Sequence, residues 1–266
     1  MKFNLLGSGG VFAPPRAGCK CNVCEEARKK GIPHARTGSS LYNYDAKLLF
    51  DTPEEIRIQL NREMIFDVKH VILTHWHPDH TMGLRVLEHL NLYETPIHVY
   101  MSKHQKETFQ KLSCGSFLDY YEKNNIIQVH DFSEEMDFGA VKVKPYYIEK
   151  TQGYYFLITD GKKQAIYAPC EYHGLKVHDS IKDVDVFIPH HLYYQNNSIS
   201  EIDYSSEEDS FEKMLEDAKQ MNAKRIIVTH IEEIFGMNHH QLNKISKKKF
   251  QNYNLEFGYD GMHINL

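Results

Sequence analysis

The amino-acid sequence predicts a layered α/β protein, with β-sheets inside and helices outside. Strand-like runs rich in Val, Ile, Tyr and Phe recur along the whole chain. The early runs follow one another as in hairpins, whereas the later ones alternate with helical patterns. The 266 residues, 41% hydrophobic and 25% charged, are close to the globular average and can bury a sizeable core.

The predicted elements follow from local patterns. Strands are predicted at 2–7, 47–51, 70–75, 97–101, 126–130, 141–148, 154–160, 164–169, 185–190 and 225–230. Helices are predicted at 53–62, 102–112, 205–221 and 239–249. Thr52 is the expected N-cap of the first helix, with Pro53 at its first helical position. The polar stretch 194–209 is expected to be a surface loop, and no repeat or linker divides the chain, so one domain over 1–266 is expected.

The charge balance argues against several partners. The chain has 31 Lys and Arg against 36 Asp and Glu, a net charge of −5, so no basic excess points to nucleic acid. No apolar run approaches the ~20 residues of a membrane span. The start, MKFNLLGSGGVF, fits a first strand better than a secretory signal. We therefore expect a cytoplasmic protein without a membrane or nucleic-acid partner, and a homodimer is left open.

The strongest motif is THWHPDH at 74–80, between an apolar strand and a helical segment that begins near Met82. Residues two apart on an extended chain point to the same side, so His75 and His77 can hold one metal ion. Asp79 and His80 then turn toward a neighbouring position and can hold a second ion. Imidazole and carboxylate groups are ligands of Zn²⁺, and the strand–turn–helix context supports a metal site.

A second cluster is the Cys-x-Cys-x-x-Cys segment at Cys19, Cys21 and Cys24. Three thiols so close together, in a chain without a secretory signal, predict a closed structural zinc site. Zinc requires a fourth ligand, and His34 is the nearest histidine in the sequence.

At the THWHPDH motif the sequence resembles the metallo-β-lactamase-fold hydrolases, whose hallmark is His-x-His-x-Asp-His. The resemblance implies a four-layer αβ/βα sandwich and places further ligands at the ends of later strands. His230, which closes the strand at 225–230, fits one such position. Cys170 and Glu171, after the strand at 164–169, are alternatives for a further ligand of the second metal: strand register favours Cys170, and charge and family habit favour Glu171.

One family ligand has no counterpart in this chain. The family pattern places a third His of the first metal after the strand at 141–148, where this chain has Glu149, Lys150 and Thr151. Either Glu149 replaces the imidazole, or Lys150 occupies the position with its own charge. We therefore expect the first metal position to be weak or empty, and one of these side chains to face it.

The Cys cluster narrows the resemblance to one subfamily. With this cluster, GSGG at 7–10 and FGYDGM at 257–262, the sequence resembles the subfamily that includes the cyclic phosphodiesterase of the carbon–phosphorus lyase pathway and coenzyme PQQ biosynthesis protein B. In these relatives the fourth structural-zinc ligand is a His three residues after the one matching His230, which corresponds to Glu233 here. Glu233 is therefore favoured over His34, and His239 and His240 remain alternatives.

These observations predict a metal-dependent hydrolase of small cyclic or linear phosphodiesters, acting through a metal-bound hydroxide on an anionic substrate. The cofactor expected is Zn²⁺, structural and catalytic, with Mn²⁺ or Fe²⁺ as alternatives in the catalytic site. Asp79 and His191 are the expected catalytic residues; His190 or His191 would protonate the leaving group. A lactone or thioester hydrolase, or a non-catalytic member with an incomplete first site, are the alternatives.

Lesser signals lie around these motifs. The turn at 8–10 can cradle a phosphate or let the chain pass close to the metal site. Arg16 and Arg36 are candidates for binding an anionic substrate. Asp51, after the strand at 47–51, is expected to hold loop backbone near the histidines.

Overall fold

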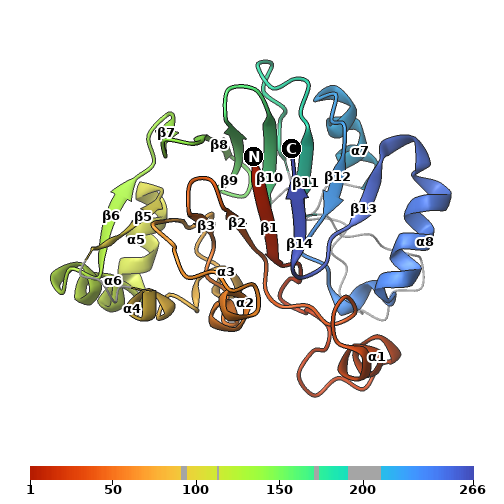
Figure 1. Ribbon diagram of the computed structural model, residues 1–266, viewed down its shortest axis with the longest axis horizontal. Helices are drawn as coiled ribbons and strands as arrows, with labels where there is room; N and C mark the ends of the chain where they lie inside the picture. The colour runs from red at the N-terminus through yellow and green to blue at the C-terminus, as the bar shows by residue number, and fades with distance from the viewer. Residues whose placement is uncertain (91–94, 113, 171–173, 191–210) are drawn as a thin grey trace.

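The computed structural model describes residues 1–90, 95–112, 114–170, 174–190 and 211–266. Two seven-stranded sheets pack against each other, and helices cover their outer faces (Figure 1). The expected four-layer αβ/βα sandwich is therefore confirmed. The two chain ends lie together, because β1 pairs with β14 and the Met1 ammonium group donates to the Leu266 carbonyl at 3.3 Å.

The first sheet has the order β14-β1-β2-β3-β4-β5-β6. Its strands are β14 (Met262–Asn265), β1 (Lys2–Gly7), β2 (Ser40–Asn43), β3 (Leu48–Phe50), β4 (His70–Ile72), β5 (Ile97–Met101) and β6 (Ile127–Asp131). Pairing is antiparallel from β14 to β3 and parallel from β3 to β6.

The second sheet has the order β13-β12-β11-β10-β9-β8-β7. Its strands are β13 (Leu255–Phe257), β12 (Ile226–Val228), β11 (Val186–Pro189), β10 (Gln164–Ala168), β9 (Gly153–Thr159), β8 (Lys142–Ile148) and β7 (Met136–Asp137). Its strands pair in parallel from β10 to β13 and antiparallel from β7 to β10.

Helices cover both sheets, and one helix stands apart. The helices are α1 (Asn22–Lys30), α2 (Ile56–Arg62), α3 (Pro78–Thr81), α4 (Val86–Leu90), α5 (Lys103–Lys111), α6 (Cys114–Lys123), α7 (Phe211–Gln220) and α8 (His239–Lys249), with short 3₁₀ turns η1 (Glu233–Phe235) and η2 (Gln251–Tyr253). Helices α2, α4, α5 and α6 bury apolar side chains against the first sheet, and α7 and α8 against the second. Helix α1 projects from one edge of the sandwich (Figure 1).

The core lies in three layers, because side chains alternate across each strand. In β3 and β4, Phe50 and Ile72 face the other sheet, whereas Leu49 and Val71 face the helices. All four are fully buried. Burial of such side chains stabilises the fold by about 1.5–3 kcal/mol each, so the sheets form a rigid support for the loops at their edges.

The structure differs from the predicted elements in several places. Strands β2, β7, β13 and β14 lie in segments without a predicted element, since short strands give little periodic signal. Helices α1 and α6 also lie in segments without a predicted element. Thr52 is not an N-cap: α2 begins at Ile56, after Glu55. The polar stretch 194–209 lies outside the described residues.

No helix in the described part of the chain is long and apolar enough to cross a membrane.

Candidate metal centre

The parallel halves of the two sheets bring the candidate ligands to one place. In each half, neighbouring strands end at the same edge, where polar side chains of different strands meet. From the first sheet come Asp51 after β3 and the THWHPDH segment after β4. From the second come Cys170, His190 and His230, which follow β10, β11 and β12.

Two groups of potential metal ligands form at this edge. His75, His77 and Cys170 make one group, and His80, Cys170 and His230 make the other. Within each group the ligand atoms lie within 4.8 Å of one another. Asp79 joins the second group, because its Oδ2 lies 3.3 Å from His230 Nε2 and 3.4 Å from His80 Nε2. A two-metal arrangement in which Cys170 is common to both groups fits these positions.

The buried imidazoles of His75 and His80 are in the form that binds a metal ion. Nε2 of His75 and of His80 are buried and make no hydrogen bond within the described residues. Burial, followed by the neighbouring His80 and His77, holds the pKa of His75 well below its ordinary value, so the ring is neutral. A neutral imidazole with a free nitrogen is the form that binds Zn²⁺.

Hydrogen bonds with Asp51 and Thr74 determine which ring nitrogen of His80 and of His75 faces the metal centre. The Asp51 carboxylate accepts hydrogen bonds from Thr74 N–H at 2.7 Å, from Thr74 Oγ1 at 2.8 Å and from His80 Nδ1 at 2.8 Å. Because a carboxylate only accepts, Nδ1 of His80 carries the proton and Nε2 keeps its lone pair. Thr74 Oγ1, which donates to Asp51, accepts from His75 Nδ1 at 3.0 Å and fixes that ring likewise.

His230 is held in a constrained backbone conformation. Its φ is +58°, in the left-handed region that few non-glycine residues adopt. A Cβ at Gly10 would lie 2.2 Å from His230 Nδ1 and 2.6 Å from Glu232 Oε1, so only glycine fits there. Burial raises the pKa of Glu232, whose Oε1 lies 3.8 Å from His230 Nδ1. Gly10 therefore lets the first loop pass close to the centre.

The expectation for the first metal position needs a correction. Glu149 and Lys150 are both exposed and belong to neither ligand group. Cys170 is instead the third potential ligand beside His75 and His77. The family resemblance predicts Cys170 as a candidate ligand of the second position, whereas β10 ends where Cys170 reaches both groups. Glu171 and His191, also proposed from the sequence, lie outside the described residues.

The turn at 8–10 does not offer a phosphate cradle. Ser8 N–H donates to Asp260 Oδ1 at 2.9 Å, Gly9 N–H to the Thr37 carbonyl at 2.8 Å and Gly10 N–H to the Ile231 carbonyl at 3.4 Å. All three donors are therefore engaged within the protein. The alternative interpretation, a tight turn beside the metal centre, fits the contacts.

Arg36 is likewise unsuited to the role considered for it. Its side chain is fully buried, and Nη1 donates to Ser8 Oγ at 2.6 Å and to the Gly258 carbonyl at 2.5 Å. Nη2 lies 3.2 Å from His239 Nδ1. Desolvation lowers the pKa of Arg36 to about 10. Arg36 thus ties the first loop to the C-terminal segment.

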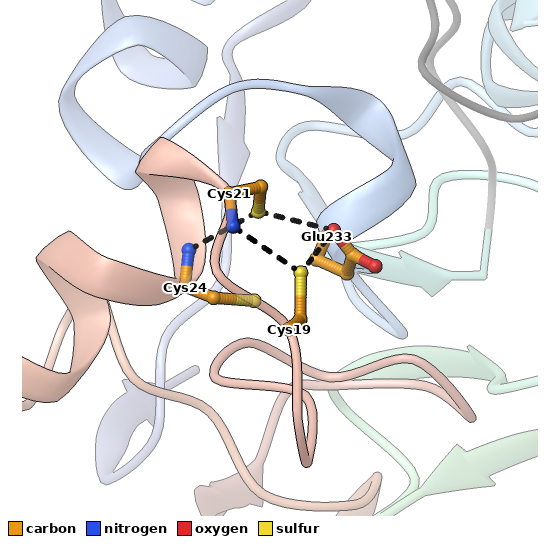
Figure 2. A group of neighbouring side chains, drawn as sticks. All are labelled: Cys19, Cys21, Cys24 and Glu233. Carbon is orange, nitrogen blue, oxygen red and sulfur yellow. Dashed lines mark hydrogen bonds between the residues drawn. The ribbon is translucent and has the colours of Figure 1, made fainter.

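The cysteine cluster forms a second, separate site (Figure 2). Cys19, Cys21, Cys24 and Glu233 place their ligand atoms within 4.8 Å of one another. Glu233 Oε2 lies 3.3 Å from Cys21 Sγ and 3.8 Å from Cys19 Sγ. Burial raises the pKa of the Cys21 thiol to about 12 in the absence of a metal, so metal binding there would release protons. Three sulfurs and one carboxylate match the four ligands of a structural Zn²⁺ site.

The other proposed fourth ligands lie away from this cluster. The His34 ring contacts His240 at a centroid distance of 4.7 Å, and its Nδ1 lies 3.8 Å from Glu26. His239 contacts Arg36 and Asn243. Within the described residues, the structure therefore brings Glu233 alone of these candidates to the thiols.

The fold and the two ligand sets place the chain among metal-dependent hydrolases of one family. The sequence pattern of the beta-lactamase superfamily domain matches residues 46–231. The chain belongs to this family, whose fold implies binding of divalent metal ions.

Solved structures share this fold over nearly the whole chain. A diphosphatase from the PhnP family is 20% identical, with a TM-score of 0.78 and coverage of 99% of this chain and 97% of that one. Zn²⁺-bound PqqB from Methylobacterium extorquens is 14% identical, with a TM-score of 0.83 and full coverage of both chains. The short form of human tRNase Z is 16% identical, with a TM-score of 0.68 and coverage of 100% and 99%. No curated protein sequence gave a significant match.

Proposed function

We propose that this protein is a phosphodiesterase that hydrolyses small cyclic or linear phosphodiesters. The observation that carries the proposal is the pair of ligand groups sharing Cys170. A cavity of about 480 Å³ lies beside them, because Asp79, which contacts His80 and His230, is one of its lining residues; Pro78 and Arg16 line it too. Metal ions beside a pocket that also presents an arginine, Arg16, suit an anionic ester.

The residues at the centre have separate tasks. His75, His77 and Cys170 would hold one divalent ion, and His80, His230, Asp79 and Cys170 a second. Bound ions supply Lewis acidity toward the phosphoryl oxygens and lower the pKa of a water ligand to ~7.

The chain's own residues prepare this chemistry. Asp51 and Thr74 orient two of the imidazoles, and the Asp79 carboxylate lies 3.4 Å from His80 Nε2 and 3.3 Å from His230 Nε2, within reach of the same ion. Hydrolysis adds the oxygen of water to phosphorus and breaks one P–O bond, so the leaving oxygen takes up a proton. His191 is the group we propose to supply it.

Two of the similar structures support a substrate that contains phosphate. One is a diphosphatase and the other a tRNase Z, and both share this fold. The small cavity of this chain, together with its net charge of −5, favours a small substrate over a nucleic acid.

A screen of the metal-loaded protein tests the proposal. The panel contains 2′,3′-cyclic nucleotides, bis(4-nitrophenyl) phosphate, lactones and a thioester, with metal content measured in parallel. Turnover of phosphodiesters with about three metal ions per chain is expected. Turnover of the lactones or the thioester alone would assign the protein to the other class of hydrolase.

A non-catalytic metal-binding protein is the second candidate. The segment at 149–151 supplies no His, and the first group depends on Cys170, a ligand that the second group also uses. Two or fewer metal ions per chain and no turnover of any substrate would favour this alternative.

A further inference from the structure

The cavity beside the metal centre is lined by side chains of both charges. Arg16, which follows Pro15 in the first loop, and Glu54 and Glu55, just before α2, are among its lining residues. Asp79, a potential metal ligand, lies on the same surface. A volume of about 480 Å³ is within the range of small-molecule sites and exceeds what a single phosphate group needs.

Arg16 is the arginine of this cavity with donors left for a ligand. Arg36 also lines it, but its two terminal nitrogens contact Ser8, Gly258 and His239. The Arg16 side chain is 46% exposed, its Nε pairs with Glu233 Oε1 at 2.7 Å, and it also donates a hydrogen bond to Cys19. A guanidinium has five N–H donors in a planar fork, so donors remain beyond these two contacts.

Glu233 fixes Arg16 to a rigid part of the molecule. The carboxylate is buried, and its other oxygen faces the Cys21 and Cys19 sulfurs (Figure 2). The backbone N–H of Glu233 donates to the Phe12 carbonyl at 2.9 Å, and Arg16 lies over the Phe12 ring at 5.5 Å. Arg16 therefore needs little ordering when a ligand binds, which favours affinity.

We propose that Arg16 forms an anion subsite that selects phosphodiesters whose second ester arm carries its own negative charge, such as a carboxylate. The inference deepens the proposed function and rests on it. The reacting phosphate would lie at the Asp79 end, and the charged arm would extend to Arg16. Glu54 and Glu55, which also line the cavity, disfavour an anion beside them, so the charged arm would bind at Arg16.

A purely structural role for Arg16 predicts different results. Three thiolates and a carboxylate around one dication leave an excess of negative charge, and an arginine beside them offsets it. In that case, replacing Arg16 would lower the metal content of the cysteine cluster or the melting temperature and would leave the choice of substrate unchanged.

The test compares two matched esters, 4-nitrophenyl ethyl phosphate and 4-nitrophenyl 2-carboxyethyl phosphate. The wild-type protein is expected to prefer the carboxylated ester about tenfold in kcat/KM, as for one charge-assisted hydrogen bond. Arg16→Gln should bring this ratio to about one, and Arg16→Lys should keep part of the preference. The control Arg85→Gln, on a side chain that is 80% exposed and outside the cavity, should keep the wild-type ratio.

A binding measurement separates this inference from the proposed function. Trp76, the single tryptophan of the chain, adjoins His77 and reports binding by fluorescence. The metal-loaded protein should bind 3-phosphonopropionate more tightly than ethylphosphonate, and Arg16→Gln should remove the difference.

The outcomes are distinct. If neither ester is hydrolysed but the binding difference depends on Arg16, the subsite stands and the phosphodiesterase proposal fails. If the wild-type protein treats both esters and both phosphonates alike, or if Arg16→Gln lowers only metal content, the subsite is overturned.

Discussion

The two ligand clusters of this protein are built in opposite ways. The histidine centre gathers side chains from five strand ends of two sheets, and most of its atoms are buried. The cysteine cluster places three ligands within six consecutive residues, on a loop and the first turn of α1, and takes one distant ligand from η1. The first depends on the sandwich being assembled, whereas the second depends mainly on local chain spacing.

The surroundings of the clusters differ in the same sense. Asp51, fixed by three hydrogen bonds, orients His80 inside the histidine centre. The cysteine cluster instead has a half-exposed arginine, Arg16, as its charged neighbour. The difference indicates that the histidine centre is organised for reactivity and the cysteine cluster for holding the first loop in place.

The largest effect is expected from His77→Ala. His77 is only half-buried, so the fold should remain, but His75 and Cys170 alone make an incomplete ligand set. We expect hydrolysis to fall at least about a thousandfold in kcat/KM. His104→Ala, which removes an exposed histidine on α5, is the matched control and should retain full activity. Wild-type turnover in His77→Ala would contradict the metal mechanism.

Cys21→Ser and Cys170→Ser should affect different metals. Cys21→Ser should remove the metal of the cysteine cluster and lower the melting temperature by several degrees, because structural zinc contributes folding free energy directly. Cys170→Ser should instead reduce metal in the histidine centre. Metal analysis with thermal unfolding checks both. An unchanged zinc count and melting temperature in Cys21→Ser would mean that the cluster is three free thiols.

Asp51→Asn should weaken the histidine centre without touching the cysteine cluster. Three donors converge on the two oxygens of Asp51, and asparagine offers one acceptor and adds competing donors. Metal affinity of the histidine centre should fall about 10- to 100-fold, as for other partners of metal ligands. Competition titration with a chelator measures it. Asp67→Asn, on an exposed carboxylate paired with Lys47, should change nothing.

The smallest effect is expected for the pH dependence of stability, through a third histidine group made of His70, His98 and His130. Among the described residues this group is not one of the potential metal-ligand groups. His70 stacks on His98, whose Nδ1 lies 2.9 Å from His130 Nε2. Burial, followed by the neighbouring His98, Lys69 and His130, lowers the pKa of His70 to about 4. The unfolded chain, with a histidine pKa of ~6.5, binds this proton more readily, so the free energy of unfolding should fall as pH drops from about 6.5 to about 4.

His70→Phe tests this. The variant keeps the contact with Phe138 and should show a shallower loss of melting temperature over the same pH range. His104→Gln is the control, with the wild-type slope. A steeper slope in His70→Phe would contradict the sign of the linkage.

Prediction from the sequence succeeded where one short segment carries the signal. The strands before His75 and His230, and the layered arrangement, follow from apolar runs and turn residues. Arg36 was considered for substrate binding and is instead fully buried, since a sequence does not show which arginines are covered by other elements. The contact of Asp51 with His80 was also missed, because it joins residues that parallel pairing of β3 and β4 brings together.

The sequence by itself determined the kinds of ligand and their local spacing: the period of two that puts His75 and His77 on one side, and the run of three cysteines. These depend on backbone geometry over a few residues. Tertiary structure decided which distant groups meet. Cys170 lies between two sets of histidines, and Glu233 reaches Cys21 across 212 residues, because strand pairing and sheet packing, not chain distance, set where each strand ends.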